Sequence, residues 1–182
     1  GFTAISEQLS PAQLVAEIDA CFKAFDAVIE KYRIEKIKTI GDAYMAAGGL
    51  PDPANGPPQD VVLAALELQE FMARHGAERE AAGLPAFQMR VGIHTGPVVA
   101  GIVGVKKFAY DIWGDTVNIA ARLESAGEAG RINLSRATYE RVAGSFRCTS
   151  RGLLPVKNAD PVDMYFVDGP RAPAHAARLE ER

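Results

Sequence analysis

The sequence predicts one domain of the α/β (α+β) class, because amphipathic helical segments alternate with short segments rich in β-branched residues. The chain has 182 residues, 48% of them hydrophobic and 24% charged, which is enough apolar material for a single core. No apolar run approaches the roughly 18 residues of a membrane span, and the first residues show no secretory-signal pattern. We therefore expect a folded, cytoplasmic domain that makes no membrane contact of its own.

The charge balance and the cysteine and histidine spacing exclude several kinds of partner. A net charge of −3 argues against broad nucleic-acid binding, which usually requires a basic surface. The two cysteines, Cys21 and Cys148, and the three histidines, His75, His94 and His175, show no spacing typical of a metal site or a disulfide framework. Cys21 and His94 are accordingly expected to be packing residues.

The first half of the chain predicts a helix, two strands and a second helix. Ser10 is a suitable N-cap ahead of Pro11, and apolar residues recur at helical spacing to about residue 31. Residues 34–40 and 43–47 predict two strands joined by a tight turn. Residues 61–72 predict the second helix.

The second half predicts a strand, a hairpin and further helices and strands. Residues 87–93 alternate apolar and polar side chains, as a half-buried strand does. The remaining predicted elements are a hairpin (98–103 and 108–112), a helix (116–124), a strand (132–134), a helix capped by Ser135 and ending near residue 142, and two strands (146–151 and 164–167). A strand ahead of Gly1 would complete a ferredoxin-like βαββαβ core, so we expect that the first strand is missing from this chain. Residues 170–182 are expected to form a flexible tail.

Two segments carry side chains that suit phosphate or metal chemistry. Asp42 follows a strand on a tight turn, where its carboxylate could bind a hard cation, although Gly-Asp is also an ordinary turn pair. Asn118 and Arg122 lie four residues apart on one predicted helix face, and an Arg can hold phosphate oxygens. An isolated Asn and Arg is usually only a solvated face, and the spacing alone names no substrate.

Four segments together resemble the catalytic domain of the class III nucleotidyl cyclases, the adenylate and guanylate cyclases. The segments are GFTAIS at the start, KIKTIGDAYMAAGGLP from Lys36, MRVGIHTGPVVAGIVG from Met89 and YDIWGDTVNIAARLES from Tyr110. They occur in the family's order and span nearly the whole chain. The resemblance implies a catalytic domain over residues 1–169 with a ferredoxin-like core. It also implies a homodimer whose active sites are shared between the two subunits.

The resemblance implies a pair of Mg²⁺ or Mn²⁺ ions in each active site. Asp42 matches one of the family's two metal-binding aspartates. The other belongs to the pattern Asp-Ile-x-Gly-Phe-Thr, of which this chain begins at the Gly, so we expect the second aspartate upstream of Gly1. On this expectation, the chain as it stands is not assumed to be active. The residues implied to line the triphosphate are Phe2, Thr3, Ile40 and Gly41 with their backbone groups, and Arg90 and Lys157 with their side chains.

The resemblance also implies which residues read the purine and which catalyse. Lys38 and Asp111 match the base-reading pair, with Ile112 beside them among the substrate-binding residues. Lys donates to the adenine ring nitrogen and Asp accepts from the exocyclic amine, whereas guanine presents the opposite pattern. Guanylate cyclases of this type typically carry Glu and Cys instead. Asn118 is expected to orient the ribose, and Arg122 to stabilise charge on the α-phosphate.

We therefore expect an adenylate cyclase that converts ATP to 3′,5′-cyclic AMP and pyrophosphate by two-metal-ion catalysis. An upstream sensor domain in the parent protein would set its activity. One alternative is a guanylate cyclase, against which Lys38 and Asp111 argue. The other is a catalytically silent cyclase-like domain with a regulatory or dimerisation role.

Overall fold

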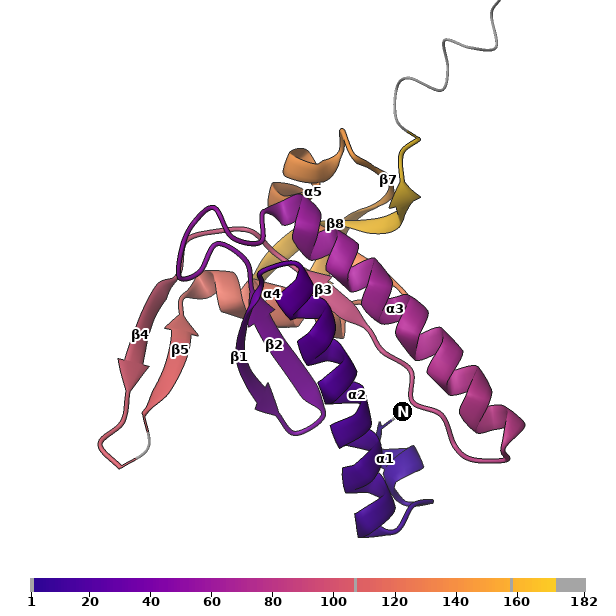
Figure 1. The fold of residues 1–182 in the computed structure, drawn as a ribbon. Helices are drawn as coiled ribbons and strands as arrows, with labels where there is room; N and C mark the ends of the chain where they lie inside the picture. The colour runs from indigo at the N-terminus through magenta and orange to yellow at the C-terminus, as the bar shows by residue number, and fades with distance from the viewer. Residues whose placement is uncertain (1, 107, 158, 173–182) are drawn as a thin grey trace, which may run out of the picture.

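The computed structural model describes residues 2–106, 108–157 and 159–172, and it has the predicted α+β architecture (Figure 1). The first elements are α1 (Phe2–Ser6), α2 (Pro11–Lys31), β1 (Glu35–Ile40), β2 (Ala43–Ala47), α3 (Pro58–Ala81) and β3 (Val91–Ile93). The later elements are β4 (Val99–Val103), β5 (Ala109–Trp113), α4 (Asp115–Ser125), β6 (Ile132–Ser135), α5 (Arg136–Val142), β7 (Phe146–Val156) and β8 (Ala159–Pro170). Most of the predicted tail, residues 173–182, lies outside the described residues. In the part that is described, no helix is both long and apolar enough to cross a membrane.

Helix α2 begins where the sequence predicts, because its first turn is capped by side chains. The Ser10 hydroxyl accepts from the Gln13 amide at 3.2 Å, and the Gln13 side chain accepts from the Ser10 amide at 2.9 Å. Pro11 occupies the first helical position, where its missing N–H costs nothing. The helix buries one stripe of residues, Glu17, Cys21, Phe25 and Ile29. Cys21 is thus buried among apolar neighbours, as predicted.

Helix α3 is longer at both ends than the predicted 61–72. Pro58 starts the helix from the Pro-rich loop, and the helix continues for nine residues beyond Met72 to Ala81. Its last turns lack the apolar stripe on which the prediction depended. Polar contacts hold them instead, because His75 and Arg79 both bind Glu17 of α2. Contacts with α2, rather than the apolar periodicity of α3 itself, therefore determine how far α3 extends.

The strands form three sheets in the described part of the chain. β1 and β2 make an antiparallel pair, β4 and β5 make a hairpin, and the largest sheet has the order β3-β6-β8-β7. β3 runs parallel to β6, and the other pairs are antiparallel. No backbone ladder among the described residues joins β1–β2 to β3. The strand expected ahead of Gly1 therefore stays a prediction.

The core lies between the helices α2 and α3 and the sheets, and the two helices run side by side (Figure 1). One side of α3 packs on the four-stranded sheet, where the buried cluster includes Val62, Ala65, Leu134, Phe146 and Val167. The other side of α3 meets α2 and β2 through clusters that include Cys21, Phe25, Ile29, Ala64 and Met72. The β4–β5 hairpin extends away from this core (Figure 1).

Strand β3 is shorter than the predicted 87–93, and the last two strands are longer than predicted. Only residues 91–93 pair with β6. Phe87 and Met89 alternate as a strand does, but they pack against the aromatic cluster between α2 and α3 without a partner strand. β7 continues to Val156, and β8 begins as early as Ala159. The two strands hydrogen-bond to each other over this length, and no pattern within either segment predicts that pairing.

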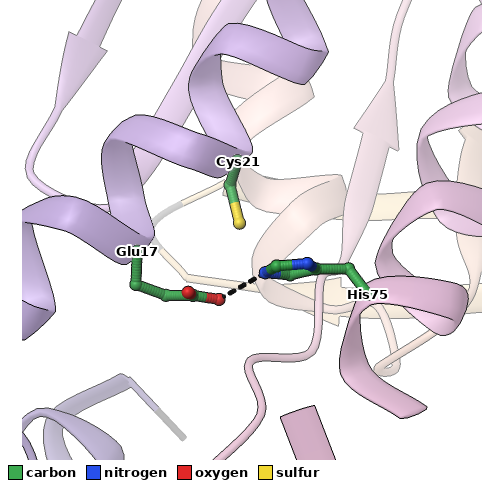
Figure 2. Close-up of side chains that lie close together, drawn as sticks. All are labelled: Glu17, Cys21 and His75. Carbon is green, nitrogen blue, oxygen red and sulfur yellow. Dashed lines mark hydrogen bonds and ion pairs between the residues drawn. The ribbon is translucent and has the colours of Figure 1, made fainter. Parts of the chain in front are cut away.

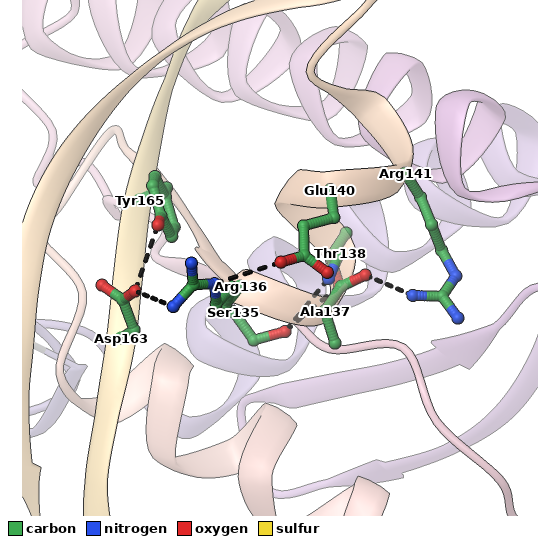
Figure 3. Close-up of polar contacts among 8 residues, drawn as sticks. All are labelled: Ser135, Arg136, Ala137, Thr138, Glu140, Arg141, Asp163 and Tyr165. Atoms are coloured by element: carbon green, nitrogen blue, oxygen red, sulfur yellow. Dashed lines mark hydrogen bonds and ion pairs between the residues drawn. The ribbon is translucent and has the colours of Figure 1, made fainter.

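Helix α5 starts at the predicted cap. Ser135 Oγ accepts from the Thr138 amide at 3.3 Å. Figure 3 shows how the same helix is tied to β8, since Arg136 reaches both Glu140 (3.1 Å) and Asp163 (3.6 Å). The cap sets the start of α5, and the Arg136–Asp163 ion pair joins the helix to β8, an inner strand of the four-stranded sheet.

Candidate active site

The first site residue, Lys38, lies on β1 beside a β-bulge. The bulge falls between Lys36 and Lys38 and interrupts the alternation of the strand. Lys36 binds Asp26 of α2 at 2.8 Å, whereas Lys38 reaches Asp111 of β5. The bulge thus directs two lysines of similar sequence context toward different elements, and only Lys38 reaches the hairpin.

Lys38 and Asp111 form a close ion pair, although they are 73 residues apart in the sequence. Lys38 Nζ lies 2.7 Å from Asp111 Oδ2, and the side chains are 41% and 20% exposed. The Lys38 ammonium and the Ile112 backbone amide, which donates to Asp111 Oδ1 at 2.8 Å, hold the pKa of the Asp111 carboxyl below its usual range. Asp111 is therefore a carboxylate acceptor at neutral pH. Ile112 is buried, so only its backbone faces this pair.

Helix α4 carries Asn118 and Arg122 on one face, as their spacing predicts. Both residues line a pocket of about 600 Å³ on the surface of the domain. Lys157, at the turn after β7, also lines this pocket. The structure thus brings together an amide, a guanidinium and an ammonium group from two distant segments. Such a set of donors suits an anion with several oxygens.

The end of α4 is held by residues that the sequence analysis did not single out. The Asn133 side chain, fully buried on β6, donates to the Leu123 carbonyl at 2.8 Å. Arg151 of β7 donates to the Ala126 carbonyl at 2.9 Å, which caps the helix. Gly92 of β3 approaches the α4 backbone so closely that a Cβ there would collide with it. No short motif marks these contacts, because each depends on packing between strands and helix.

Asp42 lies exposed on the turn between β1 and β2, as predicted. Gly41 provides the left-handed conformation of this turn with a φ of 59°. Ile40, at the end of β1, is exposed in spite of its apolar side chain. A hard divalent ion such as Mg²⁺ or Mn²⁺ prefers carboxylate and backbone carbonyl oxygens, and this turn offers both at the surface. These oxygen donors therefore fit the predicted metal. Of the two carboxylates expected to bind it, the described residues contain the one of Asp42.

The other predicted triphosphate residues lie on different elements. Arg90 precedes β3 and binds Glu124 of α4, with Nη2 2.8 Å from Glu124 Oε1. Phe2 stacks on Phe87 with the ring centroids 5.5 Å apart. Thr3 lies in α1, where its carbonyl accepts from the Ser6 hydroxyl. Each of these assignments stays a prediction, since the single chain does not bring these residues into the pocket beside Arg122.

His94 is a packing residue, as the sequence analysis expects. Its Nδ1 lies 2.7 Å from Ser135 Oγ, and burial lowers the pKa of its imidazole. The ring is thus a neutral group in the fold rather than a member of the pocket.

Comparison with known proteins places the chain in a family. A family model described as the adenylate and guanylate cyclase catalytic domain matches residues 1–169, and the chain belongs to this family. An adenylate cyclase of Mycobacterium tuberculosis is 37% identical over 174 residues, which cover 96% of this chain and 38% of that protein. Human atrial natriuretic peptide receptor 2 is 36% identical over 179 residues, which cover 94% of this chain and 16% of that protein. The chain thus spans well under half the length of these relatives.

Solved structures of both kinds of cyclase share the fold. The adenylyl cyclase CyaB from P. aeruginosa superposes with a TM-score of 0.88 at 30% identity, covering 94% of this chain and 90% of that one. The guanylate cyclase domain of RhGC from Catenaria anguillulae, in complex with GTP, gives a TM-score of 0.86 at 30% identity, with coverages of 94% and 92%. The fold and the family therefore define a class III nucleotidyl cyclase catalytic domain. They do not distinguish the two substrates.

Proposed function

We propose that this chain is the catalytic domain of an adenylate cyclase, which converts ATP to 3′,5′-cyclic AMP and pyrophosphate in the cytoplasm. The observation that carries the proposal is the Lys38–Asp111 pair, which joins β1 to the hairpin at a distance of 2.7 Å. Adenylate and guanylate cyclases match the chain equally well. The choice of purine therefore depends on the chemistry of this pair.

The pair presents a donor and an acceptor to the purine edge. Lys38 Nζ carries three N–H groups and so keeps donors for an adenine ring nitrogen beside its bond to Asp111. Asp111 accepts only, because its pKa is held low, and it suits the exocyclic amine of adenine. Guanine has a carbonyl oxygen and a ring N–H at these places. Its carbonyl oxygen, an acceptor, would face the acceptor Asp111, and its N–H, a donor, would face the donor Lys38.

The pocket beside α4 is proposed to bind the ribose and the phosphates. Asn118 would orient the ribose ring, and Lys157 would bind the terminal phosphates across the pocket. Arg122 would stabilise the charge that develops as the 3′-oxygen attacks the α-phosphorus and pyrophosphate leaves. The 3′-hydroxyl loses its proton to solvent in this step. The domain therefore works by positioning and charge stabilisation, without a protein nucleophile.

Asp42 is proposed to hold the divalent metal at the β1–β2 turn. When bound, two Mg²⁺ or Mn²⁺ ions per site would supply charge that lowers the pKa of the 3′-hydroxyl and neutralises the triphosphate. Asp42 is exposed and free of the core, so it can reach a site that a second subunit completes. Its partner carboxylate is expected upstream of Gly1.

A homodimer is proposed to assemble the site through the β4–β5 hairpin. Cyclase domains of this family bind nucleotide and work as dimers. The hairpin exposes a set of large apolar side chains, namely Val99, Ile102, Val103, Val105 and Phe108. An apolar patch of this kind on a folded domain marks a protein interface. We propose that a second copy covers it, and that a sensor domain upstream would adjust how the two copies meet.

The test measures cyclic AMP and cyclic GMP made from ATP and GTP with Mn²⁺, at high protein concentration. The chain is expressed together with any residues that precede Gly1 in its gene. We expect cyclic AMP to exceed cyclic GMP by about 10²-fold or more, since a mismatched donor and acceptor each weaken binding by roughly tenfold or more. Comparable amounts of the two products would refute the base-reading roles while leaving a cyclase.

A double variant separates base reading from catalysis. Lys38→Glu with Asp111→Cys is expected to move the preference toward GTP and to leave some cyclase activity. The matched control is Lys36→Glu, because Lys36 lies on the same strand and binds Asp26 of α2 instead. A dimeric, nucleotide-binding chain that makes neither product would support the alternative of a catalytically silent domain.

A further inference from the structure

A cluster of three potential metal ligands lies between helices α2 and α3, on elements that the cyclase site does not use. Glu17 and Cys21 are one helical turn apart on α2, and His75 faces them from α3 (Figure 2). Their ligand atoms, a carboxylate oxygen, Sγ and an imidazole nitrogen, all lie within 4.8 Å of one another. The sequence analysis did not foresee this group, because the two helices bring together residues that are 54 to 58 positions apart.

Two members of the cluster, Glu17 and Cys21, are buried, and His75 is partly exposed. Glu17 is 5% exposed and Cys21 is 6% exposed. A glutamate is rarely buried unless it is paired with a cation or coordinates a metal. Here its Oε1 accepts from His75 Nε2 at 2.7 Å, and its Oε2 accepts from Arg79 at 2.6 Å. Both oxygens are therefore oriented by their neighbours.

The arrangement leaves a defined place for an ion. Because a carboxylate only accepts, Nε2 carries the proton in the contact with Glu17. An ion that binds Nε2 and Oε1 together would replace this proton, and the neutral imidazole would then carry its proton on Nδ1. Cys21 Sγ points into the same space (Figure 2). Ligand atoms of tetrahedral zinc lie about 2.0–2.3 Å from the ion, so they can be up to about 4 Å apart. The Nε2–Oε1 distance of 2.7 Å is that of a hydrogen bond, so an ion that enters would push these two atoms apart while Sγ approaches.

Neighbouring side chains support the cluster as they would a metal site. The His75 ring stacks on Phe71 with centroids 5.4 Å apart and an angle of 9°, which fixes the direction of its nitrogens. Arg79 binds the outer oxygen of Glu17 and holds the carboxylate in place. A pocket of about 210 Å³ is lined by Glu17 and Arg79, which brings solvent to the carboxylate end of the cluster.

We propose that Glu17, Cys21 and His75 form a zinc site that clamps α2 to α3. One nitrogen, one oxygen and one sulfur ligand form a set that zinc accepts, whereas Mg²⁺ prefers oxygen alone. Zinc binds cysteine as the thiolate, so binding releases the Cys21 proton to solvent. The thiolate charge then balances one of the two positive charges that the ion brings. The site is separate from Asp42, so the proposal does not depend on the cyclase reaction.

The test titrates the metal-free chain with Co²⁺ and records its absorption. Thiolate bound to Co²⁺ gives a charge-transfer band in the near ultraviolet, which an all-oxygen site such as that of Asp42 does not give. We expect one equivalent of Co²⁺ to produce the band, and Zn²⁺ to displace it. Saturating Zn²⁺ is expected to raise Tm by about 5–10 °C, since it binds the folded chain only.

Variants separate the proposed ligands from other residues. Cys21→Ser is expected to abolish the band. His75→Gln is expected to weaken Zn²⁺ affinity by more than about 100-fold, because losing even a residue that only hydrogen-bonds to a metal ligand weakens affinity by about 10–100-fold. Cys148→Ser, at the other cysteine on β7, is the control and should behave as the unaltered chain does. A chain that gives no band, or a band that survives in Cys21→Ser, overturns the proposal. A circular dichroism spectrum of each variant excludes unfolding as the cause.

Discussion

Asn133 offers a direct measure of how firmly the catalytic helix α4 is held. It is fully buried on β6, and its Nδ2 donates to the Leu123 carbonyl at 2.8 Å. Its Oδ1 has no hydrogen-bond partner among the described residues. The substitution Asn133→Asp keeps the size of the side chain and replaces the amide donor by a carboxyl group. That group can donate to Leu123 only when it is protonated.

The cost of Asn133→Asp follows from the proton that the folded chain must hold. An aspartate in the unfolded chain has a pKa of about 3.9, so keeping it protonated costs about 4 kcal/mol at pH 7 and about 1.5 kcal/mol at pH 5. The folded chain binds the extra proton, which means that the loss of stability grows as the pH rises above 3.9. We therefore expect the variant to lose about 1.5 kcal/mol of unfolding free energy at pH 5 and about 4 kcal/mol at pH 7.

Urea denaturation of the unaltered chain and two variants at pH 5, 6 and 7 tests this reasoning. The free energy of unfolding of each variant is compared with that of the unaltered chain at the same pH. Asn133→Ala is the control, because it removes the donor without adding a charge. Its loss of about 1–3 kcal/mol should not change with pH. An equal loss for Asn133→Asp at pH 5 and pH 7 would refute the buried hydrogen bond to Leu123.

Three further predictions concern catalysis, packing and pH. Arg122→Ala should lower kcat by about 10²–10³-fold with KM little changed, because it removes a donor to the transition state, whereas Arg74→Ala on α3 should leave both unchanged in steady-state assays. Gly92→Ala should lower the free energy of unfolding by about 1–3 kcal/mol or more, because its Cβ collides with the α4 backbone. The control is Gly144→Ala, whose Cβ meets open space. Its free energy of unfolding, measured by urea titration, should stay within about 0.5 kcal/mol of that of the unaltered chain. Because burial lowers the pKa of His94, the unfolded chain takes up its proton first and stability falls below about pH 6.5; His94→Gln should reduce that slope, measured by thermal unfolding from pH 7 to 5.

The local elements could be predicted because they depend on neighbours in the chain. The cap of α2 at Ser10 and the hairpin β4–β5 follow from adjacent residues, and the structure confirms both. The common face of Asn118 and Arg122 follows from the helical repeat and is confirmed by the pocket that both line. The motifs placed the chain in the cyclase family, which the matching of residues 1–169 bears out.

Where prediction failed, a distant segment supplied the missing interaction. The end of α3 is set by Glu17 on another helix, and the lengths of β7 and β8 are set by each other. Lys157 was assigned by resemblance alone, and only the fold shows that it lines the pocket of Arg122.

The order of the elements, the family and the residue types suited to cyclase chemistry can all be predicted from local stretches of the chain. These follow from periodicities and motifs that one stretch of chain contains. The resemblance pairs Lys38 with Asp111 as base readers, but their direct contact at 2.7 Å and the grouping of Glu17, Cys21 and His75 between two helices are visible in the tertiary structure alone. The physical reason is that such contacts depend on how helices and strands pack, and packing is fixed by the whole core at once.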